Sequence, residues 1–288
     1  MALLPSRHHD TFAREHLPPE EEWPVFSFDL PQLRLPAQLN CAAWLLDAAV
    51  QQIDPRKPAI YYRDETWSYA QLAQQTNRIC QVLIDELGIV PGNRVLLRGV
   101  NSPVLFALWL AVIKVGAIAV CTMPLLRGRE LQEIIEKAQV RVAVCQADLA
   151  DELEPLCAKS TLNRLLVYGA ARPELERLMQ GKSPRFTAVP TSQDDVCLLA
   201  FTSGTTGRPK ATMHFHRDVV AMCETAAAHL LAGSAESIFT GTPPLAFTFG
   251  LGALLVFPLY FRAAIAICEA GTPAAAASGF AVRPDVVI

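Results

Sequence analysis

Short apolar runs alternate along this chain with segments of helical period, and this alternation constrains the fold more than any other feature. The strand-like runs are 94–97, 117–121, 140–145 and 164–168. The helical segments that separate them are 103–115, 129–138 and 148–159. Alternating strands and helices are typical of parallel sheets joined by helical crossovers. We therefore predict an α/β fold with doubly wound parallel sheets and flanking helices.

The composition agrees with this fold and excludes some partners. Hydrophobic residues make up 51% of the 288 residues and charged residues 18%, so many strands should be buried on both faces. The net charge is −3 and no long basic run occurs, which argues against a nucleic-acid partner. The apolar stretches 105–123 and 245–268 are each interrupted by charged residues and glycines. We interpret both as core of a soluble protein and expect no membrane partner.

Cysteine and histidine spacing gives no sign of a metal site. The eight cysteines contain no CxxC pair, and none has a histidine at metal-ligand spacing. We interpret them as small buried hydrophobes in a reducing compartment, which favours a cytoplasmic location. His214 and His216 alternate on an extended segment, and we expect them to serve packing or hydrogen bonding.

Changes in composition suggest three parts. Residues 1–36 are rich in proline and charge and should form an N-terminal extension on the surface. Residues 37–190 should form a first α/β subdomain that ends in a polar, loop-like stretch. A second α/β subdomain should start at 191 and run to 288, with the apolar run 196–201 as its first strand.

A polar loop follows strand 196–201 directly, and it carries the most informative chemistry. Its sequence is Thr202-Ser203-Gly204-Thr205-Thr206-Gly207-Arg208-Pro209-Lys210. Glycines let backbone N–H groups approach an anion, hydroxyls donate to phosphate oxygens or bind Mg²⁺, and a lysine adds positive charge. The loop predicts a polyphosphate site, although composition alone fits a flexible surface loop equally well. It is not the P-loop of the NTPase fold, which has the pattern G-x-x-x-x-G-K-[ST].

The order Thr-Ser-Gly-Thr-Thr-Gly-x-Pro-Lys resembles the phosphate-binding signature of the adenylate-forming superfamily. That superfamily contains acyl-CoA synthetases, luciferases and the adenylation domains of peptide synthetases. The segments 90–99, 123–127, 213–218 and 243–252 resemble its branch of benzoate-CoA and 2-aminobenzoate-CoA ligases. The resemblance covers essentially the whole chain and implies the N-terminal domain of such an enzyme in incomplete form.

The resemblance also implies roles for the loop residues, which would hold the β- and γ-phosphates of the Mg²⁺ complex of ATP. These residues are Thr202, Ser203, Gly204, Thr205, Thr206, Gly207 and Lys210. Lys210 and Thr202 would act in catalysis, and the hydroxyls of Thr202 and Thr205 would lie near Mg²⁺. No other metal ligand is expected among the side chains. The sequence departs from the family at Ala211, where glycine is usual.

The segment 243–252 resembles the acyl-pocket motif of the same family. Ala246 stands at the aromatic position of that motif, Phe247 at its histidine position, and Gly250 follows. A phenyl ring cannot hydrogen-bond a carboxylate, but it can form a flat wall against an aromatic ring. The pattern favours an aryl acid, with benzoate, 2-aminobenzoate and related ring acids left open. A plain core turn is the alternative interpretation.

By resemblance, the enzyme would join an aryl carboxylic acid to coenzyme A through an acyl-adenylate, with AMP and pyrophosphate as products. The family pattern also includes a Tyr-Gly-x-Thr-Glu segment, a ribose-binding Asp, a hinge Arg and a C-terminal domain with a catalytic Lys, which this sequence lacks. We therefore expect residues 1–288 alone to be an inactive fragment. A non-catalytic nucleotide-binding remnant and the aryl-acid adenylation domain of a peptide synthetase are the alternatives. Association into a homo-oligomer is also left open.

Overall fold

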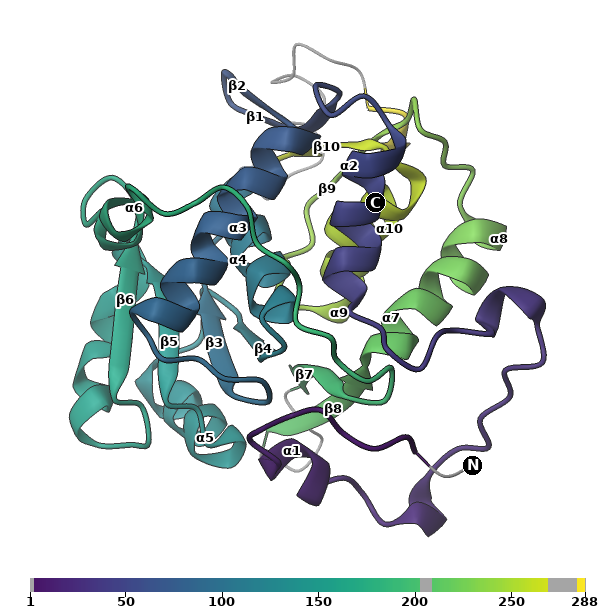
Figure 1. The fold of residues 1–288 in the computed structure, drawn as a ribbon. Helices are drawn as coiled ribbons and strands as arrows, with labels where there is room; N and C mark the ends of the chain where they lie inside the picture. Colours follow the sequence, from purple (N-terminus) through teal and green to yellow (C-terminus); the bar gives the residue numbers. More distant parts are fainter. Residues whose placement is uncertain (1–2, 203–208, 269–283, 288) are drawn as a thin grey trace.

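Two β-sheets with helices around them organise the molecule (Figure 1). The computed structural model describes residues 3–202, 209–268 and 284–287. The expected α/β fold is confirmed, because most neighbouring strands run parallel and helices connect them.

The larger sheet has six strands in the order β6-β5-β3-β4-β7-β8. Its strands are β3 (Arg94–Arg98), β4 (Ile118–Thr122), β5 (Val142–Gln146), β6 (Arg164–Tyr168), β7 (Val196–Thr202) and β8 (Lys210–Phe215). All pairs from β6 to β7 are parallel, and β8 pairs antiparallel with β7 at the edge. Side chains alternate between two hydrophobic clusters, with Val95 in one and Leu96 in the other. This double burial explains the continuous apolar runs in the sequence.

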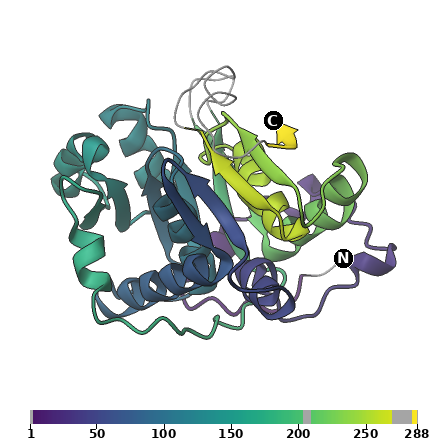
Figure 2. The ribbon, with the colours of Figure 1, turned by 90° about the horizontal axis from the view of Figure 1, so that it is seen from above.

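The smaller sheet has the strand order β11-β9-β10-β1-β2. Its strands are β1 (Pro58–Tyr62), β2 (Glu65–Ser68), β9 (Ile238–Gly241), β10 (Ala264–Ile267) and β11 (Val286–Val287). Blue β1 lies beside yellow-green β10 in Figure 2, and the two strands are parallel with Ile60 opposite Ile265. Each sheet therefore contains strands from both sides of residue 190.

Helices cover both faces of the larger sheet. The α-helices of the described residues are α1 (Phe12–Glu15), α2 (Ala48–Gln52), α3 (Tyr69–Asp85), α4 (Pro103–Lys114), α5 (Gly128–Ala138), α6 (Glu174–Met179), α7 (His216–Met222), α8 (Ala228–Leu230), α9 (Thr248–Leu251) and α10 (Phe257–Phe261). The π-helical turns η3 (Ala43–Asp47), η6 (Cys223–Ala227) and η7 (Gly252–Val256) join some of them. Helices α3 and α4 pack into one hydrophobic cluster and α5 into the other, so they lie on opposite faces.

Local sequence signals fix the start of the two central helices. The Ser68 hydroxyl accepts a hydrogen bond from the backbone N–H of Gln71 at 3.2 Å, and the Gln71 side chain accepts one from the Ser68 N–H at 2.7 Å. This reciprocal pair satisfies N–H groups that a helix N-terminus otherwise leaves without partners. The Ser102 hydroxyl caps α4 by accepting one hydrogen bond from the N–H of Leu105 at 3.2 Å.

Helix α4 is strongly apolar, and its burial explains the long hydrophobic stretch in the sequence. Lys114 at its end is only 1% exposed, and its ammonium contacts Asp47 Oδ1 at 2.6 Å and Asn77 Oδ1 at 2.7 Å. A buried lysine needs such partners. Among the described residues, no helix is long and apolar enough to cross a membrane.

The helical segment expected at 148–159 is not a single α-helix. The segment 148–159 forms two 3-10 helices, η4 (Ala147–Glu152) and η5 (Glu154–Ala158). Pro155 lies in the first turn of η5 and has no N–H to donate, so it interrupts the α-helical hydrogen-bond ladder.

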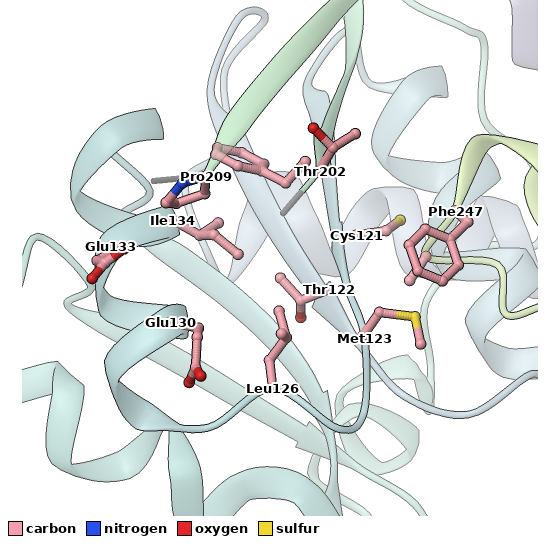
Figure 3. A pocket seen from close by; sticks show the side chains of 12 residues that line it. Cys121, Thr122, Met123, Leu126, Glu130, Glu133, Ile134, Thr202, Pro209 and Phe247 are labelled. Carbon is pink, nitrogen blue, oxygen red and sulfur yellow. The ribbon is translucent and has the colours of Figure 1, made fainter. Parts of the chain in front are cut away.

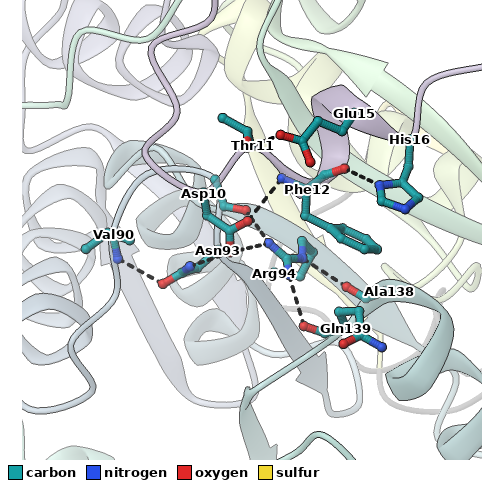
Figure 4. A network of polar contacts seen from close by, with 11 residues as sticks. Asp10, Thr11, Phe12, Glu15, His16, Val90, Asn93, Arg94, Ala138 and Gln139 are labelled. Carbon is teal, nitrogen blue, oxygen red and sulfur yellow. Dashed lines mark hydrogen bonds and ion pairs between the residues drawn. The ribbon is translucent and has the colours of Figure 1, made fainter.

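The N-terminal segment is held against the larger sheet by a polar network (Figure 4). Arg94 is buried at the start of β3 and ion-pairs with Asp10 at 2.5 Å. Its guanidinium also donates to the carbonyl oxygens of Ala138 at 2.9 Å and Gln139 at 3.1 Å. Asn93 donates a further hydrogen bond to Asp10 at 2.9 Å. Arg94 therefore ties the N-terminal segment and the end of α5 to the start of β3.

Candidate active site

A β-hairpin brings together the two ends of the predicted phosphate loop. In the antiparallel pair β7 and β8, Thr202 lies opposite Lys210, and both residues are exposed. The predicted residues between them lie outside the described residues: Ser203, Gly204, Thr205, Thr206 and Gly207. The described strands hold the first hydroxyl and the lysine of the predicted site side by side.

A cavity of about 320 Å³ lies next to this hairpin (Figure 3). It is lined by Cys121, Thr122, Met123, Leu126, Glu130, Glu133, Ile134, Phe201, Thr202, Pro209, Ala246 and Phe247. The walls come from the carboxyl end of β4, the segment after it, α5, the hairpin and the turn before α9. Carboxyl ends of parallel strands are where open α/β sheets usually bind ligands.

A buried arginine shapes the wall that follows β4. Arg98 at the end of β3 is fully buried, and its guanidinium donates to the carbonyl oxygens of Met123 at 2.7 Å, Pro124 at 3.0 Å and Leu126 at 2.8 Å. Burial lowers the pKa of Arg98. The carbonyl dipoles compensate for the lost hydration, so the arginine holds the chain of the 123–126 wall in a fixed curve.

Asn101 holds the opposite wall, which contains the predicted acyl segment. Its side-chain amide donates to the carbonyl of Pro243 at 2.9 Å, and its oxygen accepts from the N–H of Leu245 at 2.8 Å. Ala246 and Phe247 follow directly and line the cavity, with Phe247 46% exposed. The amide therefore fixes the start of the turn that presents these two side chains.

Gly250 lies behind this turn rather than among the residues that line the cavity. A Cβ atom at this position would stand 2.1 Å from the carbonyl oxygen and 2.7 Å from the carbonyl carbon of Pro244. Since both atoms belong to the backbone, a side chain here would push the turn away from α9. The close packing of Gly250 against the Pro244 carbonyl therefore requires a residue without a side chain.

The cavity has an apolar interior and charged residues near its mouth. Burial raises the pKa of the Cys121 thiol to about 12, so this thiol stays uncharged and acts as apolar lining. Glu130 and Glu133 line the cavity from α5, and both side chains are labelled in Figure 3. The ammonium of Lys137, on the same helix, donates to the carbonyl of Pro209 at 2.8 Å and ties α5 to the hairpin. Such a site can hold an apolar ring beside the hairpin that carries the predicted phosphate residues Thr202 and Lys210.

The structure brings together several of the residues predicted from the sequence. Thr202, Ala246 and Phe247 line one cavity, and Lys210 stands across the hairpin from Thr202. Sequence analysis assigned no site role to the cavity residues at the end of β4 or to the two supporting residues. Those supporting residues are Arg98 and Asn101. The available signal was a charged residue at the end of an apolar strand and an asparagine just before the next helix.

Comparison with known proteins links these features to one family. The family model described as AMP-binding enzyme matches residues 47–282. A benzoate–CoA ligase of Thauera aromatica is 33% identical over 253 residues, which is 85% of this chain and 47% of that protein. An anthranilate–CoA ligase of Pseudomonas aeruginosa is 32% identical over 225 residues, or 75% of this chain and 41% of that protein.

A solved structure supports the fold independently. The crystal structure of the anthranilate CoA ligase AuaEII in complex with anthranoyl-AMP superposes with a TM-score of 0.79 at 24% identity. The superposition covers 84% of this chain and 47% of that one. The chain thus spans about half the length of the relatives that it matches.

Proposed function

The chain belongs to the AMP-binding enzyme family, and we propose that it provides the ATP-phosphate loop and part of the acyl pocket of an AMP-forming aryl-acid–CoA ligase. The observation that carries the proposal is a shared cavity. Thr202 from the phosphate hairpin lines the same cavity as Ala246 and Phe247 from the acyl segment. The reacting carboxylate of an acid bound there would lie beside the phosphates of a nucleotide.

In the first half-reaction, a carboxylate oxygen of the acid attacks the α-phosphorus of ATP, and the bond from that phosphorus to pyrophosphate breaks. Lys210 would place its ammonium beside the phosphate oxygens, and Thr202 would donate its hydroxyl to them. Fixed donors near developing charge lower the barrier because they need no reorganisation during the reaction. ATP enters this step as its Mg²⁺ complex, and an acyl-adenylate and pyrophosphate leave it.

In the second half-reaction, the thiol of coenzyme A attacks the acyl carbon of the adenylate. The bond from this carbon to AMP breaks, the thiol proton is released, and a thioester forms. The walls held by Arg98 and Asn101 would keep the acyl group in one orientation for both steps. Such positioning is a large part of what an enzyme contributes to reactions of this kind.

An aryl acid is the substrate class that the cavity favours. Phe247 and Ile134 offer apolar surface from two sides, and Leu126 adds a third. A flat ring can pack against a phenyl side chain with favourable geometry. The similarity to ligases of benzoate and anthranilate supports the same class.

The proposal can be tested by acid-dependent exchange of pyrophosphate into ATP, measured on the natural-length product of the gene. We expect exchange with benzoate or 2-aminobenzoate, and a kcat/KM at least about tenfold lower with acetate, which leaves the apolar walls unfilled. Equal exchange with acetate would reject the aryl pocket. ATP binding without exchange for any acid would instead indicate a non-catalytic nucleotide-binding protein.

A further inference from the structure

Three soft metal-binding groups meet in the interior, apart from the residues that line the cavity. The sulfur atoms of Cys41 and Cys197 and a ring nitrogen of His216 all lie within 4.8 Å of one another. The Nδ1 atom of His216 is 3.2 Å from the Cys41 sulfur. All three side chains are fully buried. Nothing in the proposed ligase chemistry uses them.

The fold fixes each of the three groups through its own backbone. Cys41 begins the helical segment before η3, directly after Asn40, whose side chain donates to the carbonyl of Ile113 at 2.9 Å. Cys197 lies in β7, and His216 opens α7, where its N–H donates to the carbonyl of Asp195 at 3.1 Å. The three donors therefore converge on rigid elements rather than on a loop, as a preorganised site requires.

The arrangement of the donor atoms suits a small cation. In tetrahedral zinc sites the Zn–S distance is about 2.3 Å and the Zn–N distance about 2.0–2.1 Å, which places donor atoms roughly 3.5–3.8 Å apart. The two sulfur atoms and the ring nitrogen each need to move by about one ångström or less to meet this spacing. The Nε2 atom of His216 has no hydrogen-bond partner among the described residues, which allows it to carry the ring proton. The Nδ1 atom then accepts a hydrogen bond from the N–H of Cys41 at 3.2 Å, and a cation would take the Nδ1 lone pair in exchange for this bond.

The charge balance also favours an ion. Two thiolates and a neutral imidazole carry a charge of −2, which a divalent cation cancels, and a neutral cluster is far cheaper to bury than isolated charges. Thiolate is the form that binds metal.

We propose that Cys41, Cys197 and His216 form a binding site for one Zn²⁺ ion that joins the start of the η3 segment, β7 and α7. The three side chains would fill three of the four tetrahedral positions, and a water molecule would fill the fourth. We assign the site a structural role because it is enclosed and lies apart from the cavity lining. It does not depend on the proposed ligase activity, because the residues and the readout differ.

Native mass spectrometry of the tag-free chain after equilibration with Zn²⁺ and gel filtration tests the proposal. We expect one ion per chain in the wild type, and loss of that ion in Cys41→Ser and Cys197→Ser. The matched control is Cys145→Ser, another fully buried cysteine in the same sheet, which should retain the ion. Circular dichroism of each variant checks that it is folded.

A spectroscopic measurement separates a folding defect from a lost ligand. Co²⁺ in place of Zn²⁺ should give a thiolate-to-cobalt charge-transfer band in the wild type and in Cys145→Ser, and the band should vanish in folded Cys41→Ser. A wild type that takes up no ion would overturn the proposal. Equal metal loss in Cys145→Ser would also overturn it. The same holds if the refolded wild type forms a Cys41–Cys197 disulfide, seen as a mass two hydrogens lower, and binds no metal.

Discussion

Replacing Arg98 by methionine tests whether a buried guanidinium holds the cavity wall. Methionine fills similar space but leaves the carbonyl oxygens of Met123, Pro124 and Leu126 without their donor. A hydrogen bond from a charged group is worth about 1.5–3 kcal/mol, and water can reach part of this half-exposed segment. We therefore expect a loss of about 3–5 kcal/mol in the free energy of unfolding, similar to that from breaking a buried ion pair.

Urea unfolding followed by circular dichroism and tryptophan fluorescence measures this loss. Arg129→Met is the matched control, because the Arg129 side chain is 90% exposed and has one ion pair, with Glu133 at 3.4 Å. An exposed pair of this kind contributes at most about 1 kcal/mol. If Arg98→Met costs no more than the control, the carbonyl contacts do not support the wall and the reasoning is refuted.

Three further changes probe the site and its surroundings. Gly250→Ala should destabilise the protein by about 1–3 kcal/mol, as overpacking does, because its Cβ meets the Pro244 carbonyl at 2.1 Å; an unchanged urea midpoint would contradict this. Asn101→Ala should raise the KM for the acid in pyrophosphate exchange more than the KM for ATP, since its amide holds only the acyl wall; equal effects on both substrates would argue against that role. Burial lowers the pKa of His8 to about 4, although the Asp195 carboxylate acts to raise it. Between about pH 6.5 and 4 the unfolded chain therefore binds a proton at His8 that the folded chain does not. Stability should therefore fall as pH drops through this window, by about 2–3 kcal/mol in all, and His8→Gln should flatten that slope in urea titrations at stepped pH.

The sequence allowed the class of fold to be predicted because its strands are buried on both faces. Runs such as Val95 to Leu97 are apolar without alternation, which is the mark of a parallel sheet between helix layers. The order of the strands was not predictable in the same way. The pairing of β1 with β10 joins residues about two hundred positions apart, and no local pattern encodes such a contact.

The candidate site was predictable where side-chain types carry the chemistry. Thr202 and Lys210 stand out because hydroxyl, glycine and lysine together suit phosphate, whereas Arg98 binds backbone carbonyls that every residue possesses. The cluster of Cys41, Cys197 and His216 could not be predicted from sequence spacing, for another reason. Its members lie on three elements that only the tertiary fold brings together.

The most direct test of the account compares Lys210→Ala with Lys159→Ala in pyrophosphate exchange by the natural-length protein. Lys159 is also exposed but lies after η5, outside the hairpin of β7 and β8, so its loss should leave the kinetics unchanged. Loss of a charged contact to phosphate of about 1.5–3 kcal/mol should raise the KM for ATP roughly 10–100-fold in Lys210→Ala. The KM for the aryl acid should stay within about twofold, because we propose that Lys210 contacts the phosphates and not the acid. An unchanged KM for ATP would contradict the assignment of the hairpin as the phosphate site.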